Sequence, residues 1–326
     1  MVAASSWADP YQLGQGMQVG DFLLSGYGNL VAEAPNGQPA RLVVDDLSLY
    51  VNGSINRWLN PFLEAEISGA NLLHEGGADN SAGRLVLERF YDDVHLSETN
   101  TLRLGKILSP VGDWNLIHAA PLVPTITRPL TTYRGFAEYA SGLSWLHESD
   151  YSGVSPDWQI YWQPDKELVQ RPDSVSPRHH RDVFGAHLNW SFGMLDNAGL
   201  SYQQGEQLVT GQRYTLGGLN ARKVVGRLTL QGEATTAYWS AEPAGGRSHE
   251  WGAFLVADYR FTPYWHGIVE REVYQPHGTD AQSRSNLLGV AYKPNPAVVW
   301  KLEYVHQQDR SREVPSGWSA SCAVLF

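Results

Sequence analysis

The sequence predicts an all-β protein: a transmembrane, antiparallel up-and-down β-barrel of about sixteen strands, in which the third extracellular loop folds inward. Three observations predict this fold. Apolar and polar residues alternate with a period of two in nearly every window, and helical periodicity is almost absent. Short and long connections alternate along the chain. Charged residues occupy strand centres, on the face where a soluble sandwich would require a second apolar layer.

Composition agrees with a single barrel. A chain of 326 residues is long for one ordinary core, but all-β barrels are an exception to that rule. The 12 Trp, 16 Tyr and 32 Gly are typical of short strands, and no run of 18 apolar residues predicts a membrane helix. We therefore expect an N-terminal periplasmic lead-in at 1–18 and one barrel domain at 19–326.

Charge and cysteine content exclude several classes of protein. The net charge of −10 argues against a nucleic-acid partner. A single cysteine excludes an internal disulfide, and we expect neither a cofactor nor a metal. The first residues have no basic and apolar leader pattern, so an exported form would already have lost its signal peptide. We expect the mature chain in the bacterial outer membrane.

Each clear strand has one apolar face, which we interpret as facing lipid. In chain order, these faces comprise Phe22, Leu24 and Leu30; Leu47, Leu49 and Val51; Leu63, Ala65 and Ile67; Trp158, Ile160 and Trp162; Phe184, Ala186, Leu188, Trp190 and Phe192; Leu228 and Leu230; Trp251, Ala253, Leu255, Ala257, Tyr259 and Phe261; Leu288, Val290 and Tyr292; Val298, Trp300, Leu302 and Tyr304; and Trp318, Ala320, Cys322 and Val324. The opposite faces would line a wet lumen. The predicted lumen-wall residues are Glu64, Glu66, Arg103, Lys106, Arg227, Glu233, Asp258, Arg260, Lys301 and Glu303.

The connections fall into two classes that alternate. The short ones are 97–100, 262–264 and 293–296. The long, polar ones are 71–83, 109–134, 163–181, 240–248, 275–284 and 308–316. Short turns at one end and long loops at the other are typical of bacterial outer-membrane barrels, and an even strand count would place both termini at the periplasmic end.

Two places interrupt the alternation. In residues 84–96, Glu88 and Arg89 are consecutive, so a regular strand would place one of these charged side chains on the apolar face. This predicts a β-bulge near 88–91. Further along, Lys106 shares its parity with the apolar Leu102 and Leu104. Either the lysine extends to the outer rim of the barrel, or the register shifts there.

The chain ends in a strand, with Phe326 as its last residue and alternate apolar residues back to Trp318. We expect this strand to close the barrel against the first one, because closure removes sheet edges. The ending resembles the C-terminal signal of bacterial outer-membrane proteins. That resemblance implies recognition by the barrel-assembly machinery through Trp318, Val324 and Phe326.

Residues 109–134, after the predicted fifth strand, form the most distinctive loop. The segment contains four prolines and many large apolar residues, so it must bury itself inside the barrel or against a wall. Together with the preceding "LRLGKILSPVG", it resembles the phosphate-selective porin O and P family and related sixteen-stranded porins. That resemblance implies a loop that narrows the pore, for which we select Asp113, His118, Arg128 and Arg134.

The resemblance implies a porin, a passive diffusion channel for small hydrophilic solutes or ions. Few basic residues occur near the loop, whereas carboxylates are frequent on the predicted lumen faces. We therefore expect a mixed-charge lumen with an acidic excess that weakly favours cations rather than phosphate. The expected partners are outer-membrane lipid, the solutes themselves and, by analogy with other sixteen-stranded porins, two further copies in a homotrimer.

Two other functions are compatible with a barrel. An outer-membrane enzyme would need a nucleophile, a base and an orienting group together, and His187 and His266 beside Glu270 are the candidates. Neither a G-x-S-x-G nor an H-E-x-x-H motif occurs. An export or structural barrel for a polysaccharide or a periplasmic partner would use the long periplasmic turn at 146–157.

Overall fold

The computed structural model describes residues 12–75, 83–148, 155–172, 178–240, 248–308 and 314–326. Within these ranges the chain forms strands almost throughout, with a short 3-10 helix, η1, at Leu130–Thr132. The strands are β1 Met17–Val19, β2 Phe22–Pro35, β3 Arg41–Gly53, β4 Pro61–His74, β5 Arg84–His95, β6 Asn100–Leu108, β7 Tyr139–His147, β8 Ser155–Lys166, β9 His180–Ser191, β10 Asn197–Gln207, β11 Arg213–Val225, β12 Leu228–Trp239, β13 His249–Arg260, β14 Trp265–Gln275, β15 Ser283–Asn295, β16 Val298–Gln307 and β17 Gly317–Leu325. No helix in the described residues is long and apolar enough to cross a membrane.

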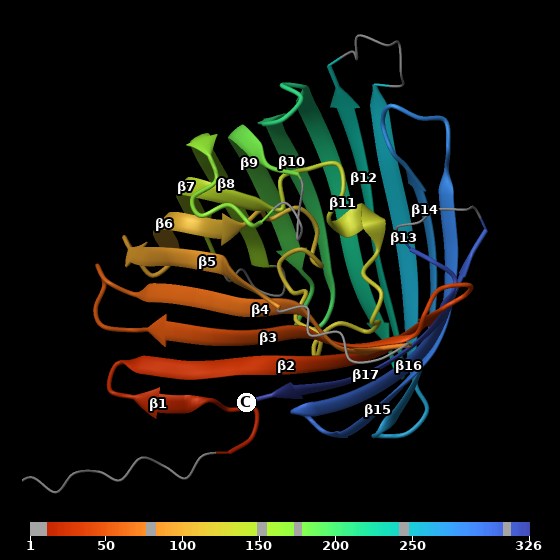
Figure 1. Cartoon of the computed structure of the whole chain (residues 1–326). Helices are drawn as coiled ribbons and strands as arrows, with labels where there is room; N and C mark the ends of the chain where they lie inside the picture. Colours follow the sequence, from red (N-terminus) through yellow and green to blue (C-terminus); the bar gives the residue numbers. More distant parts are fainter. Residues whose placement is uncertain (1–11, 76–82, 149–154, 173–177, 241–247, 309–313) are drawn as a thin grey trace, which may run out of the picture.

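Strands β2 to β17 form a closed antiparallel barrel of sixteen strands (Figure 1). Each strand pairs with the next along the chain, and β17 pairs with β2 through Ala320 and Ala32. Hydrogen bonds continue to the last residue, since the Phe326 N–H donates to the Gly26 carbonyl at 2.9 Å. The short β1 forms a hairpin with the start of β2. The predicted fold class and strand number are confirmed.

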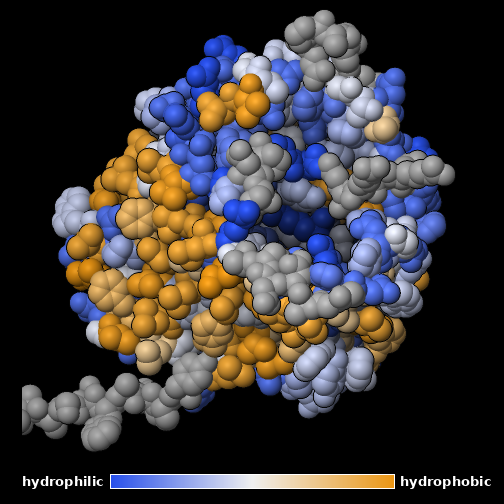
Figure 2. Space-filling view, in the orientation of Figure 1, coloured by the Kyte–Doolittle hydropathy of each residue, from blue (hydrophilic) through white to orange (hydrophobic). Residues whose placement is uncertain are grey.

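The two faces of the barrel follow the predicted alternation. On β15, for example, Leu288 is 64% exposed on the outside, whereas Leu287 is buried inside. On β4, Ile67 is exposed and its neighbours Glu64 and Glu66 are buried. Figure 2 shows apolar residues gathered over the β2–β6 side and hydrophilic residues around a central hollow. The exterior is therefore apolar and the interior polar, as a barrel in lipid requires.

Both irregular places are resolved by local backbone geometry. Glu64 pairs with Arg89 but Ala65 pairs with Leu87, so Glu88 is the extra residue of a β-bulge, as predicted. At the second place the side of the strand changes at Gly105, whose φ is +137°. Lys106 then lies inside the barrel and is 1% exposed, so the rim explanation is wrong. The pairing of β6 with β5 reaches Lys106 and that with β7 continues past it, both without a shift, so the register explanation is wrong as well.

Connections of two kinds gather at opposite ends of the barrel. At one end lie the turns at 54–60, 96–99, 192–196, 226–227, 261–264 and 296–297, which we call the short-turn end. At the other, long-loop end, several strands extend further than predicted, and β4 continues to His74 inside the predicted loop at 71–83. The predicted turn at 146–157 is described only at its two ends.

Candidate pore constriction

The segment between β6 and β7 enters the barrel instead of projecting from it (Figure 1). Several of its apolar side chains are buried against the inner wall, where Trp114 meets Phe254 of β13 edge-to-face at 5.6 Å between ring centroids. Val123 and Leu130 belong to the same buried cluster, which includes Val256. The apolar composition of the loop is therefore explained by packing inside the lumen.

A carboxylate on β12 holds the first turn of the loop. Glu233 Oε1 accepts hydrogen bonds from the backbone N–H groups of Asp113 at 2.9 Å and Trp114 at 2.7 Å. The preceding Gly112 has a φ of +70°, and a Cβ atom there would overlap the Glu233 carboxylate. Glycine at this position is required by both the backbone conformation and the close approach.

Two neighbouring side chains of β16 hold the tip of the loop. Lys301 Nζ donates to the carbonyls of Ala120 and Val123 at 2.7 Å and of Thr125 at 3.0 Å. Glu303 accepts from the backbone N–H groups of Ile126 and Thr127, each at 2.8 Å. A buried ammonium and a buried carboxylate thus satisfy backbone groups that water would otherwise have to solvate.

Further anchors hold the end of the loop. Glu272 of β14 accepts from both the backbone N–H and the hydroxyl of Thr131 at 2.8 Å. Gln203 of β10 bonds both backbone groups of Ala137, at 2.8 and 3.1 Å. All these anchors belong to the β10–β16 side of the barrel. The loop is therefore fixed along that side and faces the β2–β5 wall across a gap.

The gap is a cavity of about 180 Å³ with acidic and basic groups on different sides. The acidic residues that line it belong to β3, β4 and β5; they are Asp45, Asp46, Glu66 and Glu88. The basic residues come from the loops and β16; they are His118, Arg128, Arg171 and Lys301. We regard this cavity as the candidate constriction.

Two bulges add acidic residues to the constriction. Asn29 pairs with Asp46 and Leu30 with Val44, so Asp45 is an extra residue in β3, just as Glu88 is in β5. In a regular strand one residue of each charged pair would face lipid, but the bulge turns both inward. Asn29 Nδ2 then donates to Asp45 Oδ2 at 3.1 Å.

The cations opposite this wall are held firmly. Arg128 donates to Asn115 Oδ1 at 2.9 Å and to the Thr132 carbonyl at 2.8 Å, and pairs with Glu138 at 3.3 Å. Arg171 pairs with the same Glu138 carboxylate at 3.3 Å. Burial alone would raise the pKa of Glu138, but the arginines, Arg171 first, lower it below its ordinary value.

Histidine adds no charge to the constriction near neutral pH. Burial, reinforced by the nearby Arg128, lowers the pKa of His118 to about 3. Its Nδ1 lies 3.1 Å from the Asn115 carbonyl. The basic side therefore carries Lys301 together with Arg128 and Arg171, and the two arginines share the single Glu138 carboxylate.

Three acidic residues of the wall have no basic partner in contact within the described part of the chain. Among the described residues, Asp45, Asp46 and Glu66 form no ion pair within 4.0 Å, whereas Glu88 lies 3.8 Å from Arg171. Glu66 accepts a hydrogen bond from the Ser48 hydroxyl at 3.0 Å and shares another with the neighbouring Asp46. The constriction therefore has an acidic face on β3 and β4 and, opposite it, a basic face on which two arginines share one carboxylate.

The four predicted constriction residues separate in the structure. His118 and Arg128 line the gap. Asp113 lies towards the short-turn end, where it accepts from Asn197 at 2.9 Å and Asn220 at 2.8 Å. Arg134, by contrast, lies on the β13–β14 side, within electrostatic range of Tyr274.

Most predicted lumen-wall residues line the interior in pairs. Four of them form ion pairs: Glu64 with Arg89, and, each at 2.7 Å, Arg103 with Asp93, Lys106 with Glu167 and Asp258 with His266. Four more are buried in the contacts described above: Glu66, Glu233, Lys301 and Glu303. Two positions require correction. Arg227 lies in the β11–β12 turn and Arg260 ends β13, so both are exposed at the rim because the strands stop there.

The residues selected as an assembly signal lie on the outside of β17. Trp318 is exposed and packs against Tyr304, with 5.0 Å between ring centroids. Val324 pairs with Gly28 across the barrel closure. The Phe326 ring lies where a Cβ on Gly26 would be. Recognition by assembly machinery stays a prediction.

Sequence reasoning missed Asp45, Asp46, Glu88, Arg171 and Glu138 as members of the constriction. For the first three a signal existed, since consecutive charged residues within an apolar strand predict a bulge that faces both inward. The same reasoning found the bulge at 88–91 but was not applied to residues 45–46. For Arg171 and Glu138 only the folded loops bring the side chains together.

One histidine–serine contact bears on catalysis. His187 Nδ1 lies 2.9 Å from Ser201 Oγ, but that oxygen also accepts from the Gly112 N–H at 3.2 Å. No carboxylate is hydrogen-bonded to His187 among the described residues. His266 bonds Asp258, not Glu270 as the sequence suggested. The His187–Ser201 pair fastens the loop to the wall and lacks the third member of a hydrolytic triad.

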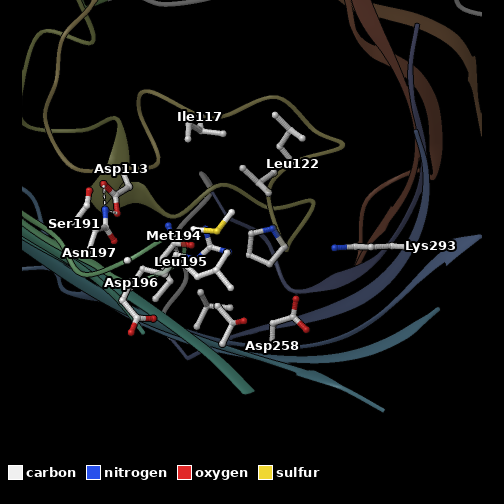
Figure 3. A pocket seen from close by; sticks show the side chains of 17 residues that line it. Asp113, Ile117, Leu122, Ser191, Met194, Leu195, Asp196, Asn197, Asp258 and Lys293 are labelled. Atoms are coloured by element: carbon white, nitrogen blue, oxygen red, sulfur yellow. Dashed lines mark hydrogen bonds between the residues drawn. The ribbon is translucent and has the colours of Figure 1, made fainter. Parts of the chain in front are cut away.

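Two wider cavities adjoin the constriction. Towards the long-loop end lies one of about 680 Å³, and towards the short-turn end one of about 310 Å³ (Figure 3). Asp45 and Ile126 line both the first cavity and the constriction. Val123 lines both the constriction and the second cavity. The three cavities therefore follow one another along the interior of the barrel.

Comparison with known proteins finds strong likeness in structure and little in sequence. No family model matches the chain. An uncharacterized protein of Aquifex aeolicus is 35% identical over 121 residues, which are 36% of this chain and 26% of that protein. The chain thus spans about a quarter of the length of that relative.

Solved structures of similar fold are outer-membrane proteins. An anion-selective porin from Comamonas acidovorans has a TM-score of 0.66 at 14% identity, covering 94% of this chain and 99% of that one. Salmonella typhi OmpF in complex with daunomycin has a TM-score of 0.66 at 12% identity, covering 94% and 97%. The outer-membrane channel DcaP of Acinetobacter baumannii has a TM-score of 0.58 at 11% identity, covering 96% and 100%. The chain has the fold of these porins.

Proposed function

We propose that the protein is a passive diffusion channel of the bacterial outer membrane for small hydrophilic solutes, with a preference for cations. The observation that carries the proposal is the gap between the anchored loop and the acidic β3–β4 face. A cluster of acidic groups without basic partners enriches cations in a narrow, water-filled passage. The porin fold of solved neighbours and the adjoining cavities support the same function.

The anchoring of the loop favours a constant narrowing over a removable plug. Carboxylate, ammonium and amide side chains on β10, β12, β14 and β16 each bond the loop backbone. Moving the loop would break these bonds together. A sleeve for a large polymer or periplasmic partner would need a wide interior, so the narrow gap argues against an export barrel. The incomplete His187–Ser201 site favours transport over catalysis.

We further propose the surroundings of the channel. The apolar exterior and its aromatic residues suit outer-membrane lipid, and the C-terminal strand suits recognition by the barrel-assembly machinery. A homotrimer is the expected assembly, supported by a trimeric form of the structural neighbour OmpT of Vibrio cholerae.

The test is the reversal potential of the refolded protein in a planar bilayer across a KCl gradient. We expect stable conductance steps with a reversal potential of cation sign. Replacing Asp45, Asp46 and Glu66 with amides should move the reversal potential towards the anion side, because the acidic face is lost. Asp21→Asn, which removes a carboxylate outside the lumen, is the control. An absence of conductance from a folded barrel would refute the channel; an unchanged reversal potential in the triple variant would refute the role of these carboxylates.

A further inference from the structure

The cavity at the short-turn end has a lining different from that of the constriction (Figure 3). It lies between the inward loop and the β9–β10 turn at 192–196, and it measures about 310 Å³. That volume falls within the range of small-molecule sites. Apolar side chains meet there from two separate segments, with charged groups around them.

Four apolar side chains in this cavity have no apolar cover. Ile117 and Leu122 of the loop are 55% and 58% exposed, and Met194 and Leu195 of the turn are 100% and 54% exposed. Figure 3 shows the two pairs on different sides of the same space. Removing such side chains from water is favourable, so an apolar occupant would be stabilised here.

The acidic groups of the cavity are already bonded. Asp113 accepts from Asn197 and Asn220, as described above. Asp196 bonds Lys223 Nζ at 2.5 Å and the Val224 N–H at 2.8 Å. Asp258 is 2.7 Å from His266 Nδ1. The oxygens of these carboxylates are therefore occupied by protein donors, although the amide donors of Asp113 leave its charge unbalanced.

The basic groups of the cavity are different. Arg222 and Lys293 both line it, and their side chains form no hydrogen bond or ion pair with any described residue. In Figure 3, Lys293 extends into the cavity from the side opposite Asp113 and Met194. Among the described residues, the charged side chains of this cavity that have no bonded partner are therefore basic, whereas the constriction has acidic side chains with no basic partner in contact.

We propose that this cavity is a binding site for amphipathic organic anions, whose apolar body packs between the loop and the turn and whose anionic group meets Arg222 on one side or Lys293 on the other. The inference rests on the proposed function only in taking the lumen to be open to solutes. The acidic constriction repels such an anion, so the site fills from the short-turn end. A bound anion would then obstruct the channel from that end alone.

The experiment uses three probes that separate charge from apolar body. The full barrel in detergent is titrated calorimetrically with 3-phenylpropionate, with propionate, which lacks the ring, and with 3-phenylpropylamine, which reverses the charge. We expect 3-phenylpropionate to bind at least about tenfold more tightly than either of the others. Arg222→Gln with Lys293→Gln should weaken its binding about tenfold, at roughly threefold for each partly exposed ion pair.

A second variant tests the apolar half of the site. Leu122→Ser with Met194→Ser should also weaken 3-phenylpropionate binding, whereas Arg227→Gln, which removes a rim cation outside the cavity, should leave it unchanged. Partition of the probe into detergent contributes the same heat for the wild type and every variant, so it cancels when their titrations are compared. Equal binding to the wild type and both double variants would overturn the proposal.

Channel recordings on the same preparations separate this inference from the proposed function. We expect 3-phenylpropionate to block the current when added to the short-turn side, and much less when added to the other side. Conductance without binding would leave the channel standing and refute the anion site. Binding without conductance would leave the site standing and refute the channel.

Discussion

Lys301→Met tests whether the loop is held by wall side chains. Methionine has a similar length but donates no hydrogen bond, so the carbonyls of Ala120, Val123 and Thr125 lose their common donor. Each bond to a charged group contributes about 1.5–3 kcal/mol. Water entering from the lumen replaces part of this, and we expect the loop to be loosened by about 3 kcal/mol in total.

A change of about 3 kcal/mol raises the population of the detached loop roughly 100-fold. Hydrogen exchange measures that population directly, because the amides of Ile126 and Thr127 are bonded to the adjacent Glu303 and exchange when the loop leaves the wall. We expect their exchange to accelerate by about that factor. Single-channel recordings should show a noisier current with transitions to higher conductance.

Lys293→Met is the matched control. It removes the same charge from a residue that lines the lumen, but Lys293 forms no bond with the loop among the described residues. Its loop amides should exchange at the wild-type rate. Unchanged exchange in the Lys301 variant, or equal acceleration in both variants, would refute the conclusion that Lys301 anchors the loop.

The remaining predictions concern stability. Leu288→Arg, on the lipid face of β15, should lower the free energy of unfolding in lipid vesicles by about 2–4 kcal/mol, whereas Leu288→Phe should change it little. If urea titrations show equal effects for the two variants, Leu288 does not face lipid. Burial lowers the pKa of His118 to about 3, against an ordinary value of 6.5. Between these two values the unfolded chain binds a proton on His118 that the folded chain does not. The free energy of unfolding should therefore fall by about 1.4 kcal/mol per pH unit as the pH drops below 6.5. His118→Gln should flatten that dependence in urea titrations from pH 7 to 4, and the exposed His95→Gln should not.

The barrel was predictable because its determinants are local. A strand in lipid needs alternate apolar residues, and that period is visible in segments such as 251–261 and 298–304 without knowledge of their neighbours. The inward loop was predictable for a similar reason, since a loop with large apolar residues such as Trp114 and Val123 is too apolar to remain in water. Consecutive charges at 88–89 indicated a bulge that the structure confirms.

The constriction was less predictable because its members come from different segments of the chain, and no local sequence pattern indicates which of these segments meet. Asp113 and His118 are only five positions apart, yet one binds the β10–β11 wall and the other lines the gap. Arg227 and Arg260 satisfy the lumen parity but lie at strand ends, whose positions the alternation does not define. Glu138 brings Arg128 and Arg171 together only after two loops fold into one barrel.

The sequence by itself determined the barrel, its strand number, its inner and outer faces and the loop that enters it, because each depends on the period of side chains along one strand or the solubility of one segment. Only the tertiary structure decided which wall holds the loop and which wall faces it across a gap. That choice depends on bonds between distant residues, such as Lys301 with Ala120 and Glu233 with Trp114. Hydrogen bonds of this kind leave no periodic trace in a sequence, because their partners are set by the strand register and barrel closure rather than by position along the chain.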